Sequence, residues 1–278
     1  MKRWFFLLVG CLPLTAMAWN AAGHRQIAAL AWEVMEEPIR QQAVILIKQH
    51  PDYSRWRARQ QEEDPDYGAF LEAAIWADDI RRDKRFYSSD EPETPLLPGF
   101  PNMARHGDWH YQDEAGGQLA KRLPELAEIL ANSTRGQDER AYALVWLLHL
   151  VGDLHQPLHT QGRSDRGGNL FNARFFARPH ERISLHRYWD DLPGPLWLRG
   201  ERLRASLPDI ERTQDGGKPG AVKNWLAESR ALVERGVYPP GEDGEISPEF
   251  HQQAKATARQ RIALAGYRLG MWLNQLLA

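Results

Sequence analysis

The stretch HLVGDLHQPLH, from His149 to His159, offers three side chains that can bind a metal ion: His149, Asp153 and His159. His149 and Asp153 are four residues apart, so on a helix both side chains project from one face. Pro157 ends that helix because its ring clashes with the preceding turn, which leaves His159 on chain that can fold back. Imidazole and carboxylate ligands without thiolate suit a catalytic zinc ion.

The same spacing of four residues recurs at His186 and Asp190, within SLHRYWDD. Both His/Asp pairs stand among aromatic or aliphatic residues, where an unpaired ionised aspartate would be costly. A metal ion would remove that cost. A His–Asp hydrogen bond beside a loop is the other interpretation of each pair.

Four further residues have suitable chemistry but no spacing that identifies a site on its own. Asp78 and Arg81 share one face of a predicted helix by i, i+3 spacing, whereas Asp79 points away towards solvent. His110 and His24 are isolated histidines, and an isolated histidine is more typical of a structural residue. Among the remaining histidines, His155 is expected either to be structural or to support a metal ligand, and four are expected at the surface: His50, His106, His180 and His251.

Composition limits how the chain can bind a polyanion. The 278 residues have a net charge of −2, and removal of residues 1–18, with Lys2 and Arg3, changes it to −4. A globally basic surface for nucleic acid is therefore absent, and binding has to be local, by metal ions or a few arginines. Cys11 is the only cysteine, so a chain that begins at Trp19 has no disulfide and no thiolate ligand.

Residues 1–18 have the pattern of a secretory signal. Lys2 and Arg3 precede an apolar run, and Ala16-Met17-Ala18 forms a small-residue cleavage site. The run is too short, and too broken by proline, to span a membrane. A lipoprotein cleavage box at Leu8-Val9-Gly10-Cys11 is the competing interpretation. We expect a signal peptide over 1–18, one domain over 19–278, and a periplasmic or secreted protein.

The metal-binding residue types lie on or beside predicted helices. Periodic apolar residues predict helices over 22–37, 38–50, 66–82, 117–132, 137–154, 184–191, 221–235 and 248–277. The helix over 137–154 is apolar on nearly all sides, so it should be central and buried. Residues 86–103 are predicted to be an exposed loop, 106–113 a loop or short strand, and NLFNARFF is compatible with one arm of a small β-hairpin. The expected fold is mainly α, a single helical domain with long loops.

Six motifs occur in a fixed order: WNAAGH, WADDIR, WHYQD, HLVGDLHQPLH, DRGGN and LHRYWD. Together they resemble the single-strand-specific, zinc-dependent class I nucleases of fungi, plants and bacteria, which share a helical fold with zinc phospholipase C. The resemblance runs from Trp19 to the last helix, where ARQRIALAGYRLGMWLN also looks like the family. It implies a single-domain, mainly α fold of the phospholipase C/nuclease type.

The resemblance also implies three zinc ions per chain. The first would be held by Asp78, His110, His149 and Asp153. The second would be held by His159, His186 and Asp190. The third would be held by the α-amino nitrogen and carbonyl oxygen of Trp19, with His24 and Asp153. Asp153 would then bridge two ions. The chain departs from its relatives in having Asn20 where many have glycine, and in lacking the disulfides of eukaryotic members.

By the same resemblance, the reaction would be metal-assisted phosphodiester hydrolysis, with Asp78, Arg81 and Asp153 in the catalytic centre. Zinc lowers the pKa of bound water from ~15.7 towards ~7, so hydroxide forms near neutrality. Arg81 would hold a phosphate oxygen, Tyr111 would stack on a base, and Asp113 would accept a hydrogen bond from it. Asn169 would line the same pocket, with a simple turn residue as its other interpretation. Arg81 is otherwise a solvated member of RRDKR.

The expected substrates are single-stranded DNA and RNA, cleaved to 5′-phosphorylated products by a monomer, with 3′-nucleotidase activity as a further expectation. Stacking requires an unpaired base, which favours single strands. A zinc-dependent phospholipase C is the first alternative, and WHYQD together with Asp190 favours the nuclease. A non-catalytic periplasmic zinc-binding protein is the second, and the arginine beside the Asp78 ligand position argues against it.

Overall fold

The computed structural model describes residues 19–113, 116–161, 163–175, 178–210, 212–213, 220–241 and 244–278. The signal peptide and the lipoprotein box at residues 1–18 lie outside these ranges. Within them, no helix combines the length and the apolar character that a membrane crossing requires.

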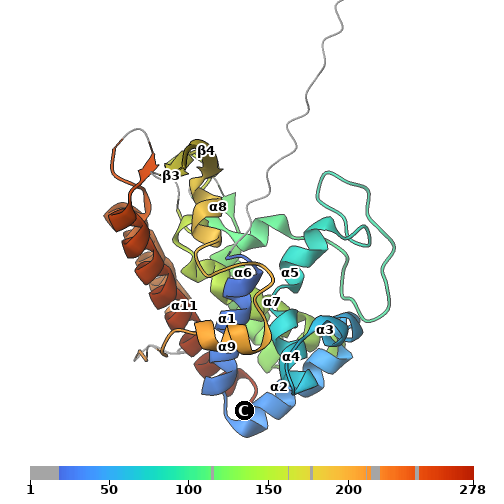
Figure 1. The fold of residues 1–278 in the computed structure, drawn as a ribbon. Helices are drawn as coiled ribbons and strands as arrows, with labels where there is room; N and C mark the ends of the chain where they lie inside the picture. Colours follow the sequence, from blue (N-terminus) through green and yellow to red (C-terminus); the bar gives the residue numbers. More distant parts are fainter. Residues whose placement is uncertain are drawn as a thin grey trace, which may run out of the picture.

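The fold is mainly helical, as predicted, and α7 (Gln137–His155) is its central helix (Figure 1). Five longer helices pack against α7: α1 (Ala21–Val34), α2 (Glu37–Gln49), α6 (Leu119–Ala131), α10 (Ala221–Leu232) and α11 (Pro248–Leu276). Every residue of α7 from Ala141 to His155 is buried. A helix that is apolar on all sides can bury its side chains only at the centre of the fold.

Shorter elements complete the helical part. They are α3 (Tyr53–Arg59), α4 (Pro65–Ala73), α5 (Trp76–Asp79), α8 (Leu185–Asp190), α9 (Gly200–Ser206), a π-type segment (Val233–Val237), and 3₁₀ turns at Ile80–Arg82, Gly107–His110 and Pro157–His159. Helices α3 and α9 were not predicted. Residues 86–103 form the expected loop between α5 and the 3₁₀ turn that carries His110.

The single helix predicted over 66–82 is wrong, because the chain breaks between α4 and α5. Helical bonding stops at Ala74 and Ile75, and two carbonyls near the break are bonded by side chains from elsewhere. Arg59 donates to the carbonyl of Glu72 at 3.1 Å, and His149 donates to the carbonyl of Ala74 at 2.8 Å. These long-range hydrogen bonds compensate for the helical bonds that the break removes.

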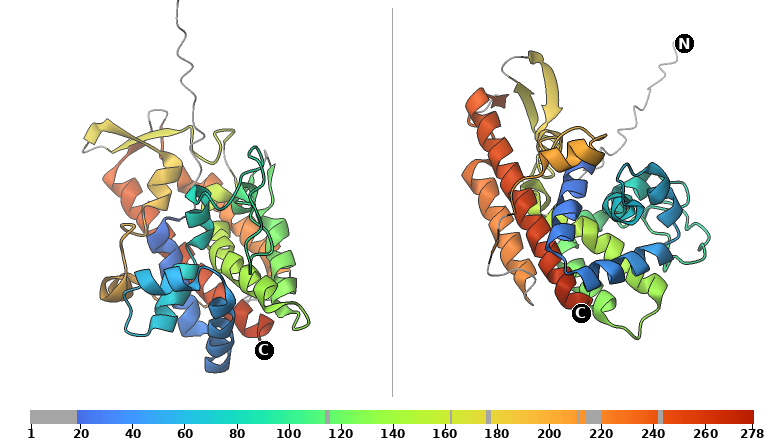
Figure 2. Two further views of the ribbon diagram at one scale, coloured as in Figure 1. Left: turned by 90° about the vertical axis from the view of Figure 1, so that its right-hand side faces the viewer. Right: turned by 60° about the horizontal axis from the view of Figure 1, so that its bottom comes forward.

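Strands are few and lie at one end of the molecule. Strand β3 (Asn172–Phe175) pairs antiparallel with β4 (Arg178–Ser184), which confirms the predicted hairpin, and β5 (Glu245–Ile246) adds in parallel to β3. Figure 2 shows this hairpin projecting from the helical body beside the N-terminal end of α11. A second, minimal pair joins β1 (Gln112–Asp113) to β2 (Gly116–Gly117).

The surface position predicted for His50 is wrong. Only 3% of the residue is exposed, and its ring stacks on Trp56 at 4.7 Å and meets the edge of Trp76 at 4.9 Å. Its Nδ1 accepts a hydrogen bond from the backbone N–H of Asp52 at 3.2 Å. That acceptor role requires a neutral ring, so His50 belongs to the aromatic core.

Acid is therefore expected to destabilise the fold through His50. Burial lowers its pKa to about 3, whereas an unfolded histidine titrates near ~6.5. The folded state excludes the proton, so the neutral ring contributes its full share of the unfolding free energy above about pH 6.5. The unfolding free energy then falls by about 1.4 kcal/mol per pH unit as pH falls towards 3. His50→Asn, which retains an acceptor, should flatten the pH dependence of the unfolding free energy by that amount between about pH 6 and 4.

Urea denaturation at several pH values measures this slope. His180→Asn is the matched control, because His180 is exposed. Equal slopes for His50→Asn and the unaltered protein would contradict the role of His50.

Candidate metal centre

Eight of the nine predicted ligands are brought together as three groups of side chains. These groups are His24, His149 and Asp153; Asp78, His110 and His149; and His159, His186 and Asp190. The first two groups share His149, so they form one continuous cluster. Their members come from α1, α5, the 3₁₀ turn Gly107–His110, and α7. Within each group the ligand atoms lie within 4.8 Å of one another.

Asp153 lies at the centre of the larger cluster. Its Oδ1 is 3.4 Å from Nε2 of His24 and 3.4 Å from Nε2 of His149, while its Oδ2 is 2.9 Å from Nδ1 of His110. Nε2 of His149 is also 3.8 Å from Oδ1 of Asp78. The two carboxylate oxygens of Asp153 therefore face different histidines, which is the arrangement that a bridging ligand requires.

The smaller cluster gathers at the other end of HLVGDLHQPLH. Nε2 of His159 lies 3.0 Å from Nε2 of His186, which in turn lies 3.6 Å from Oδ2 of Asp190. Gln156 donates to the other oxygen of Asp190 at 2.7 Å. Because Pro157 ends α7 and starts a 3₁₀ turn, His159 reaches α8 rather than continuing along the helix.

Three histidines are oriented by backbone carbonyls. Nδ1 of His149 donates to Ala74, Nδ1 of His159 to His110, and Nδ1 of His186 to Gly167. Each bond fixes the ring and places the proton on Nδ1, which leaves Nε2 with its lone pair towards the cluster. Sequence reasoning did not identify these carbonyls, because they are distant in the chain from the rings that they hold.

The DRGGN motif has a backbone role in this orientation. Gly167 has φ of +63°, and a Cβ there would collide with the carbonyl oxygen of Leu158. Its own carbonyl accepts from His186 at 2.7 Å. The Asn169 amide donates to the carbonyl of Arg166 at 2.8 Å, as a turn residue does.

The N-terminal end of α1 is tied to the end of α8. The side-chain oxygen of Asn20 caps α1 by accepting from the backbone N–H groups of Ala22 and Gly23. Its amide donates to the carbonyl of Gly194 at 2.7 Å, and its backbone N–H donates to the backbone carbonyl of Asp190 at 3.0 Å. Asn20 thus holds the buried Trp19 beside α1, which explains why asparagine is compatible with this position.

Burial sets the electrostatics of the cluster. Desolvation raises the pKa of Asp153 to about 6 and raises the pKa of Asp190, while it lowers those of His24 and His110. For His149, desolvation is outweighed by the carboxylates of Asp153 and Asp78, and its pKa is raised. Buried acids with no cation thus tend to hold protons, and a metal ion would replace them.

Several cluster atoms are buried without a hydrogen bond. They include both ring nitrogens of His24, Nε2 of His110 and Oδ1 of Asp153. A buried polar atom left in this way is costly. A neutral imidazole has a lone pair on only one of its two nitrogens, so His24 offers one electron pair and Oδ1 of Asp153 offers others. A cation bound between them would satisfy both, because Nε2 of His24 lies 3.4 Å from that oxygen. The residues present therefore fit a metal centre made of nitrogen and oxygen ligands.

Known proteins with similar sequences identify the chain. A family model described as S1/P1 Nuclease matches residues 19–278. Endonuclease 4 and Endonuclease 3 of Arabidopsis thaliana are each 42% identical to the chain, covering 99% and 97% of it and 95% and 94% of their own lengths. Nuclease P1 of Penicillium citrinum is 26% identical over 60% of the chain and 70% of its own length. The chain belongs to the S1/P1 nuclease family.

Members of this family are zinc-dependent nucleases with three zinc ions. The chain has three groups of side chains that could bind metal, the same number. The chain is therefore a hydrolase that acts on phosphodiester bonds of nucleic acids. This result confirms the predicted family, fold and enzyme class. It also removes the alternative of a non-catalytic zinc-binding protein.

Of the predicted substrate-binding residues, Arg81 contacts a member of the larger cluster. Nε of Arg81 is 3.2 Å from Oδ1 of Asp78, and each side chain is 9% exposed. Tyr111 directly follows His110 and is half-buried. Oδ1 of Asp113 accepts from the backbone N–H of Gly116 at 3.0 Å. Base binding by Tyr111, Asp113 and Asn169 stays a prediction.

The C-terminal end of α7 is held by a buried polar network. Ser229 donates to the carbonyl of Leu154 at 2.6 Å, and Arg261 donates to that of His155 at 3.3 Å. Arg268 donates to Nε2 of His155 at 2.9 Å, which requires the neutral ring that burial favours. His155 is therefore structural, as predicted, and the last turn of α7, with Asp153, is anchored to α10 and α11.

Gly152 is a positioning residue that sequence analysis missed, although glycine inside a helix is unfavourable enough to indicate a reason. A Cβ at this position would lie 2.9 Å from Nδ1 of His24. Gly152→Ala is expected to displace His24, to lower the zinc content below three per chain, and to reduce nuclease activity by at least about tenfold, the effect typical of disturbing the support of a metal ligand. Elemental analysis and a single-strand cleavage assay measure both effects.

Gly107→Ala is the control, because a Cβ there meets no atom within 4 Å. Full zinc content and activity in Gly152→Ala would contradict the close-approach argument.

Proposed function

We propose that this nuclease holds three zinc ions and hydrolyses single-stranded DNA and RNA to 5′-phosphorylated products, with 3′-nucleotidase activity at the same centre. The observation that carries the proposal is the position of Asp153, whose two oxygens face His24 and His149 on one side and His110 on the other. A carboxylate in that position can serve two ions.

The ligand assignment is the one that the family resemblance implies, and the three groups of side chains contain eight of its nine residues. Asp78, His110, His149 and Asp153 hold the first ion. His159, His186 and Asp190 hold the second. Trp19, through its α-amino nitrogen and carbonyl oxygen, holds the third together with His24 and Asp153. This third position requires removal of residues 1–18, so secretion or export to the periplasm completes the centre.

Bound zinc supplies an acidified water molecule and positive charge for the phosphate. The residues of the chain would orient the zinc ligands and the phosphate. The backbone carbonyls of Ala74, His110 and Gly167 bind Nδ1 of His149, His159 and His186, so Nε2 of each ring would be the atom that holds an ion. The guanidinium of Arg81 lies beside Asp78, where it would donate to a phosphate oxygen.

Selection of single strands is assigned to the segment that follows His110. Tyr111 offers a flat ring for an unstacked base, and Asp113 offers a carboxylate to the donors on its edge. Asn169 contributes its carbonyl oxygen, since its amide is engaged with Arg166. A base that is paired and stacked within a duplex cannot reach the ring, so duplex DNA should be cleaved more slowly.

Four substrates tested in parallel distinguish this function from its alternative: single-stranded DNA, single-stranded RNA, duplex DNA and phosphatidylcholine. We expect chelator-sensitive cleavage of both single strands, with 5′-phosphate termini, and at least about tenfold slower cleavage of the duplex, given that each stacked base contributes ~1–3 kcal/mol. Preferential hydrolysis of phosphatidylcholine would instead identify a phospholipase C.

Asp153→Asn tests the bridging role. The amide offers one oxygen, in place of a carboxylate that serves two ions, so activity should be abolished and more than one zinc ion lost per chain. Elemental analysis of protein whose first residue is confirmed as Trp19 by N-terminal sequencing measures the loss. Asp138→Asn, at the exposed start of α7, is the control. Retention of full zinc content by Asp153→Asn would reject the bridging assignment.

A further inference from the structure

Three successive backbone carbonyls, at positions 110–112, each accept a hydrogen bond from a different part of the fold. Their donors are, in chain order of the carbonyls, Nδ1 of His159, the backbone N–H of Leu119 and the guanidinium of Arg230. The last two bonds are 3.1 Å and 3.2 Å long. The segment that carries Tyr111 is thus tied to the smaller ligand cluster, to the start of α6 and to α10.

Arg230 differs from the other two donors because it binds two segments at once. Its Nη2 donates to the carbonyl of Gln112, and its Nε donates at 3.0 Å to the carbonyl of Thr160. The planar guanidinium holds its N–H groups in a fixed fork, so the two carbonyls are kept at a fixed separation. Arg230 therefore links the segment after the ligand His110 to the residue directly after the ligand His159.

Both ends of this link are anchored in the body of the protein. Arg230 lies in α10, which packs against α6, α7 and the 3₁₀ turn Pro157–His159. The preceding residue, Ser229, is buried and donates to the carbonyl of Leu154 in the last turn of α7 at 2.6 Å. Thr160 has no exposed surface. Arg230 and Thr160 are therefore fixed relative to α7, and the guanidinium extends that constraint to the segment after His110.

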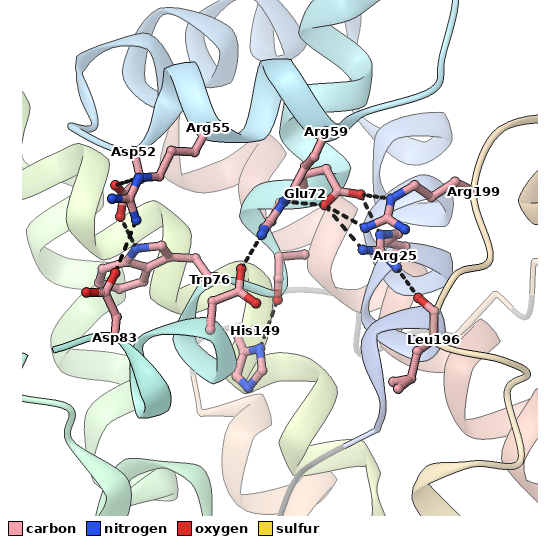
Figure 3. A network of polar contacts seen from close by, with 12 residues as sticks. Arg25, Asp52, Arg55, Arg59, Glu72, Trp76, Asp83, His149, Leu196 and Arg199 are labelled. Carbon is pink, nitrogen blue, oxygen red and sulfur yellow. Dashed lines mark hydrogen bonds and ion pairs between the residues drawn. The ribbon is translucent and has the colours of Figure 1, made fainter.

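Arg230 makes these bonds to the backbone and not to a carboxylate, which sets it apart from the arginines beside Glu72. Figure 3 shows the guanidiniums of Arg25, Arg59 and Arg199 converging on that buried carboxylate. In the part of the chain that the structure describes, Arg230 forms no ion pair with an acidic side chain, and its hydrogen bonds go to the two carbonyls. The fork of N–H groups, more than the charge, is the property that the fold uses here.

The segment that Arg230 holds carries Tyr111, to which the proposed function assigns the stacking of a base. Its backbone is enclosed from another side by Gly117, which has φ of +89° and where a Cβ would collide with the carbonyl oxygen of Tyr111. A ring that is held in place before the base arrives loses little conformational entropy on binding. Fixing the backbone of Tyr111 therefore strengthens the binding of a base without any contact between Arg230 and the substrate.

We propose that Arg230 is a positioning residue for base recognition, and that by bridging the carbonyls of Gln112 and Thr160 it fixes Tyr111 relative to the metal centre. This inference rests on the proposed function, in which Tyr111 stacks on a base. The effect of Arg230 passes through Tyr111. It should therefore change the binding of substrates that have bases and leave a base-free phosphodiester unaffected.

The test compares steady-state kinetics on the dinucleotide TpT and on an analogue in which each sugar carries hydrogen in place of its base. Arg230→Met, a linear side chain without an N–H donor, should raise KM for TpT about fivefold, the lower end of what one stacked base contributes. It should leave kcat for TpT, kcat/KM for the base-free analogue and the zinc content unchanged. A residue with a merely structural role would not separate the two substrates.

Three further variants show how the effect is transmitted. On a Tyr111→Ala background, Arg230→Met should have no further effect on KM for TpT, because two residues that act through one contact are not additive. Arg230→Lys keeps the charge, and a fold that tolerates it, but presents one nitrogen to two carbonyls, so its KM should be intermediate. Lys223→Met, which removes an exposed charge from the same helix, should match the unaltered enzyme.

Different outcomes reject different statements. If Tyr111→Ala raises KM for TpT while Arg230→Met and Arg230→Lys do not, the role of Arg230 is rejected and the proposed function stands. The role is also rejected if Arg230→Met lowers kcat/KM equally for TpT and the base-free analogue, or if it lowers the zinc content. If Tyr111→Ala itself leaves KM for TpT unchanged, base stacking on Tyr111 fails and the role of Arg230 fails with it. An unaltered, zinc-loaded enzyme that cleaves no single strand would overturn the proposed function as a whole.

Discussion

The burial of Asp153 is the constraint on which the rest of the structure depends. Its side chain has no exposed surface, on a helix that is buried from Ala141 to His155. An ionised carboxylate in such a place is unfavourable unless a cation or several donors compensate for it. Burial keeps His24 and His110 neutral, so these two rings offer lone pairs and no positive charge. A cation at this position would compensate for the carboxylate, so metal binding and folding would stabilise each other.

Residues around the ligands fix the orientation of the ligand side chains. Backbone carbonyls at Ala74, His110 and Gly167 orient three imidazoles, and Gly152 allows α1 to approach α7 closely. The break between α4 and α5 contributes to this orientation, because it leaves the carbonyl of Ala74 available to accept the hydrogen bond from His149. Ligands held by such contacts lose little freedom when the metal binds, so less of the binding free energy is spent on ordering them.

Charge is distributed so that a protein with a net negative charge can bind a polyanion. Most arginines near the centre are paired with carboxylates, as Arg25, Arg59 and Arg199 are with Glu72. Pairing of this kind leaves little unneutralised positive charge on the side chains around the centre, so bound zinc would supply most of the local positive potential for a polyanion.

Local periodicity was enough to predict the buried helix of HLVGDLHQPLH, the shared face of His149 and Asp153, and the turn that redirects His159. These features depend on residues close together in the chain. The six motifs, taken in order, then indicated the family. Tertiary structure alone decided that the helix predicted over 66–82 breaks at Ala74, that His50 lies among tryptophans, and that Arg230 bridges two distant carbonyls. Each of these outcomes depends on partners tens of residues away, and hydrogen bonds and burial over such separations leave no periodic signal in one sequence.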